Sequence, residues 1–135
     1  MANKDKNPGL IGVVADIIKV DKEYEIAIET ALGGSIQNIV TDNEQTAKSM
    51  IQFLKKNRFG RATFLPLTSI RGRRAENADR ICGEEGVIGL ASDLIRVDSQ
   101  FGHLADYLLG RVFIVDHIDH ALLWPRNYPL FFKNL

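Results

Sequence analysis

Apolar residues follow two patterns along this chain, strand-like runs and helix-like stripes, and each pattern occurs twice. The run GLIGVVADIIKVD at residues 9–21 returns as GVIGLASDLIRVD at residues 86–98, with seven identical positions at a constant offset. Most other pairs are mild exchanges, such as Lys19 with Arg96. Each run is predicted to begin with a strand. This internal sequence repeat predicts two structurally related lobes.

An amphipathic helix is predicted after each copy, because apolar residues recur at positions i, i+3, i+4, i+7 and i+8. An aspartate precedes each helix as a candidate N-cap, Asp21 or Asp98. A glycine follows each helix, Gly33 or Gly110, and suits the left-handed conformation that ends helices. The two stripes are Tyr24, Ala27, Ile28, Ala31 and Leu32, and Phe101, Leu104, Ala105, Leu108 and Leu109.

Short β-branched runs then predict a strand in each half, at residues 35–40 and 111–115. In the first half, a capping-box pattern from Thr41 to Glu44 predicts a further helix. Its apolar face comprises Ala47, Met50, Ile51 and Leu54, and residues 57–60 close it. A last strand is predicted over residues 61–65, stopped by Pro66. After Asp116 the parallel between the halves is expected to break down, because Pro125 and Pro129 interrupt the helix pattern.

The predicted fold class is therefore mixed α+β, with two pseudo-repeated lobes that each combine a small sheet with packed helices. The expected organisation is an N-terminal tail at 1–8, lobe I at 9–66, a connector at 67–85 and lobe II at 86–135. A short helix is expected near 76–81 in the connector. Lobe II is expected to be truncated or altered at its C-terminus.

Composition adds the expectation of a soluble, globular, cytoplasmic protein. Hydrophobic residues make up 45% of the chain and charged residues 25%, which is typical of folded domains. No apolar run approaches the roughly 20 residues that cross a bilayer, and the N-terminus lacks the apolar region of a signal peptide. No membrane partner is expected. The single cysteine, Cys82, is predicted to be a small buried or half-buried side chain.

A zero net charge conceals a basic segment between residues 55 and 80, with eight basic side chains against two acidic ones. Such a segment attracts polyanions and predicts weak, sequence-independent, salt-sensitive binding to DNA. The alternative is a solvated surface with no partner. The candidate DNA contacts are Lys55, Lys56, Arg58, Arg61, Arg71, Arg73 and Arg74.

No catalytic motif occurs in the context that its chemistry requires, so no catalytic residue, metal or cofactor is expected. The glycines of GLIGVVAD precede the apolar run, whereas a dinucleotide fingerprint places them after a strand. The cluster DHIDH, residues 116–120, lacks zinc-site spacing and reads as a polar helix start. Asp16 and Asp93 recur in the repeat and could be paired acids, although a structural role is favoured. A small α/β enzyme remains the least favoured alternative.

Three strings carry a specific family resemblance: ALGG at 31–34, GRATFLPL at 60–67 and ASDLI at 91–95. With their order and spacing, from about Gly9 to Leu122, the chain resembles the hinge domain of bacterial structural-maintenance-of-chromosomes (SMC) proteins. The resemblance implies a homodimerisation module of a chromosome segregation and condensation ATPase. It implies that the hinge joins coiled-coil arms far from the ATPase heads and that opposite lobes meet across a two-fold axis. It also implies DNA contact by basic residues near the coiled-coil root, in the bacterial cytoplasm and in association with the nucleoid.

The chain departs from the family pattern near its C-terminus. Family members continue with a strand and a glycine-rich motif, whereas this chain reads LLWPRNYPLFFKNL. An exposed apolar tail at Leu130, Phe131, Phe132 and Leu135 is expected unless something covers it. Strand edges and small residues near residues 60–65 and 110–115 are expected to form the dimer interface. The candidate interface residues are Gly60, Arg61, Thr63, Gly110, Val112, Phe113 and Ile114.

Overall fold

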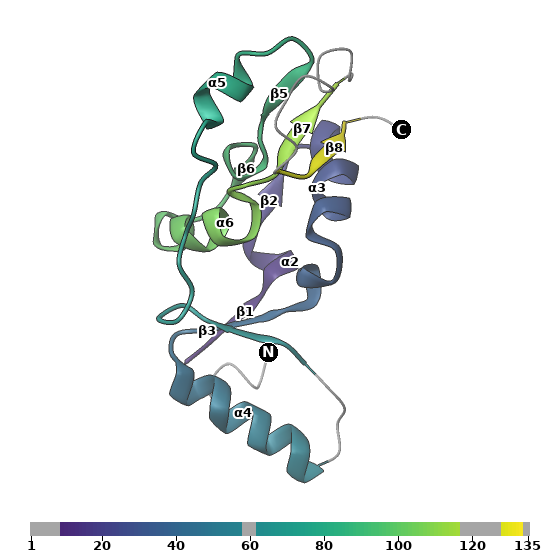
Figure 1. Cartoon of the computed structure of the whole chain (residues 1–135). Helices are drawn as coiled ribbons and strands as arrows, with labels where there is room; N and C mark the ends of the chain where they lie inside the picture. Colours follow the sequence, from purple (N-terminus) through teal and green to yellow (C-terminus); the bar gives the residue numbers. More distant parts are fainter. Residues whose placement is uncertain (1–8, 58–61, 117–127, 134–135) are drawn as a thin grey trace. The chain divides into compact units, whose positions relative to one another are not determined.

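The structure of the protein is a computed structural model that describes residues 9–57, 62–116 and 128–133 (Figure 1). The chain divides into two compact units. Unit 1 comprises Met1–Ile17 and Gly34–Ile70, and unit 2 comprises Ile18–Gly33 and Arg71–Leu135. The fold is mixed α+β, as the sequence pattern predicts.

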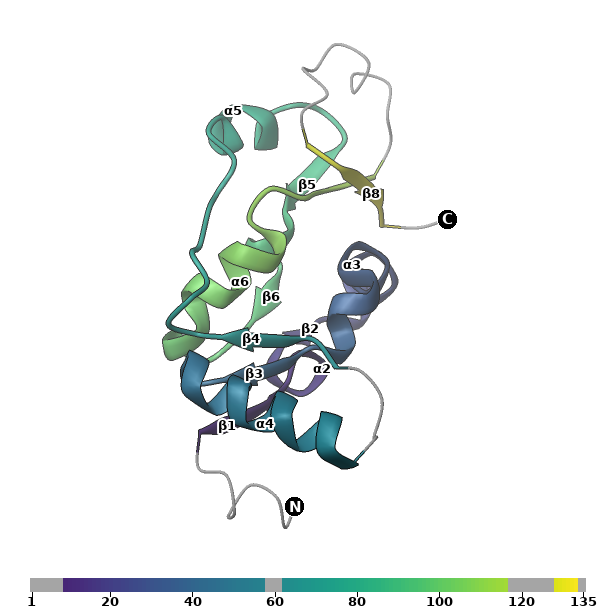
Figure 2. The same ribbon diagram turned by 60° about the horizontal axis from the view of Figure 1, so that its bottom comes forward.

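Unit 1 contains a three-stranded sheet in the order β1-β3-β4, with β3 antiparallel to β1 and parallel to β4 (Figure 2). The central strand is the most buried, because Val40 and Thr41 are both 0% exposed. Helix α4 contacts β3 and β4. The elements of unit 1 are β1 (Leu10–Val13), α2 (Val14–Ile17), β3 (Ile39–Thr41), α4 (Glu44–Asn57) and β4 (Phe64–Pro66).

Helix α4 confirms the predicted helix but begins two residues later than the capping box from Thr41 predicts. Thr41 still pairs with Leu10 in the sheet, and its hydroxyl donates to the Asn43 carbonyl at 3.0 Å. The cap is Asn43, whose Oδ1 accepts the Thr46 N–H at 3.0 Å. Thr41 is thus the last residue of β3, and the residue that caps the helix follows two positions later.

Two predicted strands of unit 1 are shorter than expected. The segment at 35–40 begins in a 3-10 helix, η2 (Gly33–Gln37), and only Ile39 starts the strand. Pro66 does not stop β4 but belongs to it, pairing with Thr41. This position tolerates proline because β4 is an edge strand among the described residues, so the missing N–H interrupts no ladder.

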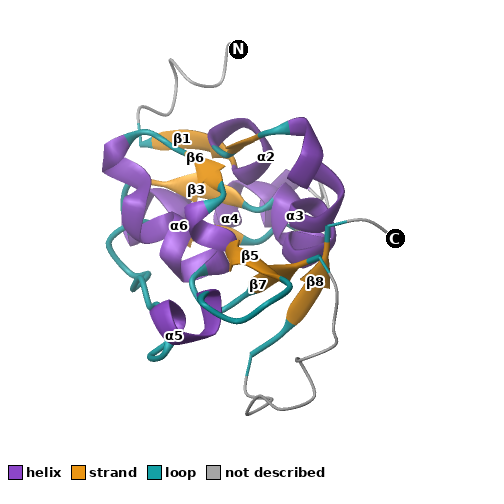
Figure 3. Ribbon diagram, turned by 90° about the horizontal axis from the view of Figure 1, so that it is seen from above, coloured by secondary structure: helices purple, strands orange, loops and turns teal. Residues whose placement is uncertain are grey.

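Unit 2 repeats the sheet of unit 1 in the order β5-β7-β8, again with one antiparallel and one parallel pair (Figure 3). A second, two-stranded sheet pairs β2 with β6, and Lys19 lies opposite Arg96. The strands of unit 2 are β2 (Lys19–Val20), β5 (Val87–Leu90), β6 (Ile95–Arg96), β7 (Phe113–Val115) and β8 (Leu130–Phe132). Its helices are η1 (Lys22–Tyr24), α3 (Glu25–Leu32), α5 (Ala78–Cys82), η3 (Ala91–Asp93), η4 (Ser99–Phe101) and α6 (Gly102–Leu109).

The sequence repeat corresponds to a structural repeat that includes its irregularities. The register slips between Leu10 and Gly12 in β1, and between Val87 and Gly89 in β5, which are equivalent positions of the two copies. A β-bulge at the same place in both sheets bends the two strands in the same way. The two halves therefore share a strand geometry as well as a residue pattern.

The expectation that the parallel ends at Asp116 is wrong, because β8 occupies in unit 2 the place that β4 occupies in unit 1. Its residues Leu130, Phe131 and Phe132 pair with β7 and are half-buried, so they do not form an exposed tail. The helix expected after Asp116 lies outside the described residues, as does Leu135.

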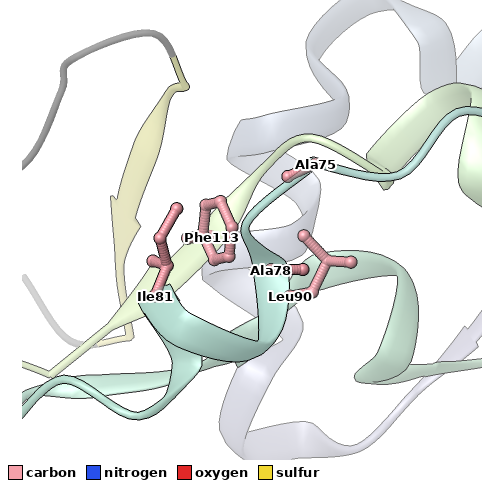
Figure 4. Packing of buried hydrophobic residues seen from close by; sticks show 5 residues of the cluster. All are labelled: Ala75, Ala78, Ile81, Leu90 and Phe113. Atoms are coloured by element: carbon pink, nitrogen blue, oxygen red, sulfur yellow. The ribbon is translucent and has the colours of Figure 1, made fainter.

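The core of unit 2 gathers side chains from the connector, α5, β5 and β7 around Phe113 (Figure 4). The Phe113 ring is 0% exposed and packs edge-on against the Tyr128 ring, with centroids 5.8 Å apart. Helix α5 confirms the predicted short connector helix and supplies Ala78 and Ile81 to this core. The part of the connector from Arg71 onwards therefore belongs to unit 2 and contributes to its core.

The predicted ends of α3 and α6 are only partly right. Asp21 and Asp98 each precede a short 3-10 helix and make no side-chain cap. Their carbonyls accept the Tyr24 and Phe101 N–H groups instead, at 2.9 and 2.8 Å. A positive φ of 54° ends α3 at Gly33, as predicted for a glycine. Gly110 has a φ of −71°, so its lack of a side chain serves another purpose.

Candidate functional site

The basic segment is spread over both units. Lys55 and Lys56 are exposed in the last turn of α4, where cations favour the negative end of the helix dipole. Arg71 and Arg73 are exposed in the irregular part of the connector, within unit 2. In the described part of the chain neither of these two arginines makes an ion pair. Arg58 and Arg61 lie outside the described residues.

Arg74 differs from the other basic candidates because two carboxylates of unit 2 bind it. Its Nη1 and Nη2 donate to the Asp93 carboxylate at 2.9 and 2.8 Å, and Nη1 lies 3.3 Å from Asp106 Oδ1. Ser92 Oγ is a weaker contact at 3.5 Å. The hydrogen bond to Asp93 is the largest cause that raises the pKa of the Arg74 guanidinium, against a smaller opposing effect of burial. The fork geometry is that of a strong, bidentate pair.

The backbone beside Arg74 runs in close contact with the end of α6. The Ala75 N–H donates to the Gly110 carbonyl at 2.8 Å. A side chain at Gly110 would place its Cβ less than 3.0 Å from the Arg73 carbonyl oxygen, and one at Gly72 would meet the His103 backbone. Glycine at these two positions is therefore explained by close approach of two chain segments.

The candidate interface residues near β7 contribute mainly to the interior of unit 2. Phe113 and Ile114 are 0% exposed and Val112 is 9% exposed. Because β7 lies between β5 and β8, its backbone pairs on both sides. Thr63, by contrast, is exposed next to β4, and its carbonyl accepts the Ile39 N–H at 2.9 Å. Gly60 and Arg61 lie outside the described residues.

The two recurrent aspartates have different surroundings. Asp16 is exposed on α2 of unit 1, whereas Asp93 is held by Arg74 in unit 2. Of the DHIDH cluster, Asp116 is described and residues 117–120 are not. Among the residues that the structure describes, no group of three or more His, Cys, Asp or Glu side chains could hold a metal ion.

Cys82 is half-buried, as predicted, and burial raises the pKa of its thiol. The thiolate, which is the reactive form, is therefore disfavoured at neutral pH.

No helix within the described ranges combines the length and the apolar character that a membrane span requires.

Sequence comparison decides the family. The family model described as "SMC proteins Flexible Hinge Domain" matches residues 7–123, most of the chain. The chain belongs to the SMC hinge family. Two relatives of this hinge are the chromosome partition protein Smc of Lactiplantibacillus plantarum, 41% identical over 94% of the chain, and that of Bacillus subtilis, 42% identical over 87%. The hinge chain spans only 11% and 10% of these two proteins, respectively.

Solved hinge structures share the fold. An asymmetric dimer of the Geobacillus stearothermophilus SMC hinge domain gives a TM-score of 0.90 at 37% identity, covering 98% of this chain and 55% of that one. The Pyrococcus furiosus SMC hinge domain gives a TM-score of 0.81 at 29% identity, covering 97% of this chain and 68% of that one. The predicted hinge-like fold is thereby confirmed.

Sequence reasoning missed the carboxylates that bind the basic side chains of this hinge. Asp21 was assigned to a helix cap, but its carboxylate pairs with Arg96 of β6. Asp93 and Asp106 bind Arg74, far away in sequence. The repeat places aspartates at equivalent positions, Asp16 with Asp93 and Asp21 with Asp98, and so indicates a role for them. It does not show which basic side chains they bind.

Proposed function

We propose that this hinge is the homodimerisation module of an SMC chromosome segregation and condensation ATPase of the bacterial cytoplasm. In this proposal it joins two coiled-coil arms, and the ATPase heads lie elsewhere in the full-length protein. The observation that carries the proposal is the likeness to a solved hinge dimer over 98% of the chain, at a TM-score of 0.90. No catalytic, metal or cofactor role is assigned.

Open sheet edges support this proposal. In the described part of each unit the outer strands, β1 and β4 or β5 and β8, have a neighbour on one side only. Unpaired backbone groups on an edge favour pairing with another chain, and a closed two-fold pair covers them. The pseudo-repeated lobes, 9–66 and 86–135 with the connector 67–85 between them, would offer related edges to a second copy.

The proposed interface residues fall into two groups: exposed residues that could contact the partner, and buried residues that support the sheet. Thr63, exposed beside the β4 edge, is the described candidate that could touch a partner directly. Val112, Phe113 and Ile114 are buried, so we assign them the role of holding the sheet whose outer strands face the partner. Gly60 and Arg61 stay in the proposed interface as neighbours of Thr63 in sequence.

Dimerisation is tested by light scattering coupled to size exclusion over a concentration series. We expect a mass of two chains that persists on dilution through the micromolar range. Thr63→Glu, which places a charge beside the β4 edge, is expected to raise the dimer dissociation constant about tenfold or more, because charge on an edge opposes pairing. Thr30→Glu, at an exposed position of α3, is the matched control and should leave the dissociation constant unchanged. A single-chain mass at tens of micromolar would contradict the proposal.

A second proposed activity is weak, sequence-independent DNA binding by Lys55, Lys56, Arg71 and Arg73, together with Arg58 and Arg61. The supporting observation is that the four described side chains are exposed and carry the same charge. Polyanion binding by such groups is governed by counterion release. We leave Arg74 out of the direct contacts because two carboxylates already bind it.

DNA binding is tested by fluorescence anisotropy with a short duplex at several salt concentrations. Lys55→Gln with Lys56→Gln is expected to weaken binding. The slope of log affinity against log salt is negative, and its magnitude should decrease by about 2, one for each lost phosphate contact. Lys19→Gln with Lys22→Gln removes the same charge outside the basic segment and should change the slope little. A parent isotherm that does not move between low and moderate salt would remove the DNA-binding proposal.

A further inference from the structure

The connector enters unit 2 through a stretch that has no regular structure of its own. The second segment of unit 1 ends at Ile70, and the chain returns to unit 2 at Arg71. Residues 72–75, called the strap below, form neither helix nor strand. Hydrogen bonds of a helix or a sheet therefore do not fix the path of the strap, and other contacts must do so.

Besides the burial of Ala75 in the core, three contacts fasten the strap to the rest of unit 2. The Ala75 N–H donates to the Gly110 carbonyl at 2.8 Å, just after α6. Gly72 runs against the His103 backbone so closely that a Cβ there would lie 3.0 Å from the His103 carbonyl oxygen. Between these two points, Arg74 reaches Asp93 of η3 and Asp106 of α6 at once.

The Arg74 contacts join three segments that are distant in sequence. A guanidinium that binds one carboxylate through both nitrogens has its orientation fixed as well as its position. The third contact, to Asp106 at 3.3 Å, ties the same group to the helix along which the strap runs. Without Arg74, the strap would keep the backbone hydrogen bonds of Ala75, the glycine contacts and the burial of the Ala75 side chain in the core. All of these except the glycine contacts lie at the C-terminal end of the strap.

The charges around Arg74 also oppose a direct contact with a phosphate. Two carboxylates face this one guanidinium, so the local charge of the three groups is negative when all are ionised. A DNA phosphate would have to displace one of them and approach the other. Arg71 and Arg73, on either side of Gly72, are exposed and have no ion-pair partner among the described residues.

We propose that Arg74 is a positioning residue: it fastens the strap along α6 through Asp93 and Asp106 and so holds Arg71 and Arg73 in place, without itself contacting phosphate. The part that concerns Arg71 and Arg73 as DNA contacts rests on the proposed DNA binding. The part that concerns the strap is independent of any ligand.

The strap is tested first without DNA, by limited trypsin digestion of the full chain. Trypsin cleaves after arginine in segments that open, so Arg71 and Arg73 report on the strap directly. In Arg74→Gln and in Asp93→Asn, cleavage after Arg71 and Arg73 is expected to be about fivefold or more faster, because each variant breaks the bidentate pair. Asp106→Asn, which loses only the longer contact, should give a smaller increase.

Two control variants and one measurement keep this result specific. Arg80→Gln removes an exposed arginine of α5 and Asp98→Asn an exposed carboxylate, and neither residue contacts the strap in the described structure. In both controls, cleavage after Arg71 and Arg73 should be as fast as in the parent. Thermal unfolding midpoints are measured for every variant, so that faster cleavage is compared only between variants that remain folded at the digestion temperature. Cleavage after Arg71 and Arg73 at a rate within twofold of the parent, in both Arg74→Gln and Asp93→Asn, would contradict the proposal that Arg74 fastens the strap.

The second test separates positioning from direct contact through the salt dependence of DNA affinity. Arg73→Gln should decrease the magnitude of the negative salt slope by about 1. Arg74→Gln should leave that magnitude unchanged and weaken binding only modestly. The opposite result would show that Arg74 contacts phosphate: a slope magnitude that decreases by about 1 in Arg74→Gln and increases in Asp93→Asn, where Arg74 loses its bidentate partner. If the parent shows no salt-dependent binding, the DNA part fails, and the trypsin result alone decides the strap.

Discussion

Replacing Phe113 with alanine is expected to lower the free energy of unfolding by about 3–5 kcal/mol, the cost of removing a fully buried aromatic side chain and leaving a cavity. Phe113 is 0% exposed, lies in the central strand β7 and packs against Leu90 and Ile81 of the core. A small domain has only about 5–15 kcal/mol of stability in all. The measurement is urea unfolding followed by circular dichroism.

The matched control for this change is Phe53→Ala on α4, where the side chain is 57% exposed. The same atoms are deleted, but they leave a largely solvated site, so the expected loss is below about 1 kcal/mol. Equal losses in the two variants would show that Phe113 does not occupy a closed core. The comparison also tests whether β7 serves to support the sheet, which is the role proposed for it in dimerisation.

Gly110→Ala is expected to cost about 3 kcal/mol, the upper part of the usual range for overpacking. The new Cβ would meet the carbonyl oxygens of Arg73 and Asp106 at less than 3.0 Å. Both atoms belong to the backbone, so no flexible side chain can move aside. At a φ of −71° the conformation itself suits alanine, and without the close approach the substitution would stabilise the protein. The sign of the change therefore tests the packing of the strap.

Gly102→Ala at the start of α6 provides the contrast. Nothing lies within 4 Å of the position that its Cβ would take, and alanine has the higher helix propensity. An increase of about 0.5–1 kcal/mol in the free energy of unfolding is expected. Thermal and urea unfolding of both variants are compared under one buffer condition. A Gly110→Ala variant as stable as Gly102→Ala would contradict the contact between the strap and α6.

Local pattern was sufficient to predict the helices that have a strong apolar stripe. The stripe beginning at Tyr24 gave α3, and the stripe beginning at Phe101 gave α6, because burial of one face is what stabilises a short helix in a protein. The strand boundaries were less accurate. Pro66 lies inside β4 because an edge strand has an open side, and the sequence does not say which strands lie at an edge.

The side-chain partners of the candidate site could not be predicted in the same way. The basic segment was visible in the sequence as a count of charges, but Arg74 looked the same as Arg73. Asp93 and Asp106, which distinguish them, lie 19 and 32 positions further along the chain. Contacts of this kind depend on where η3 and α6 are placed after folding, and no local pattern encodes that placement.

The sequence by itself determined the doubled unit, the α+β class and the family of this hinge, because these follow from residue order and periodicity alone. Only the tertiary structure decided that β8 completes the second sheet, that Gly110 is required by the passage of the strap, and that Arg74 is bound by two carboxylates. The physical reason is the same in each case. A strand pairing, a close approach and an ion pair each need two segments brought together, and their free energies depend on distances that exist only in the folded chain.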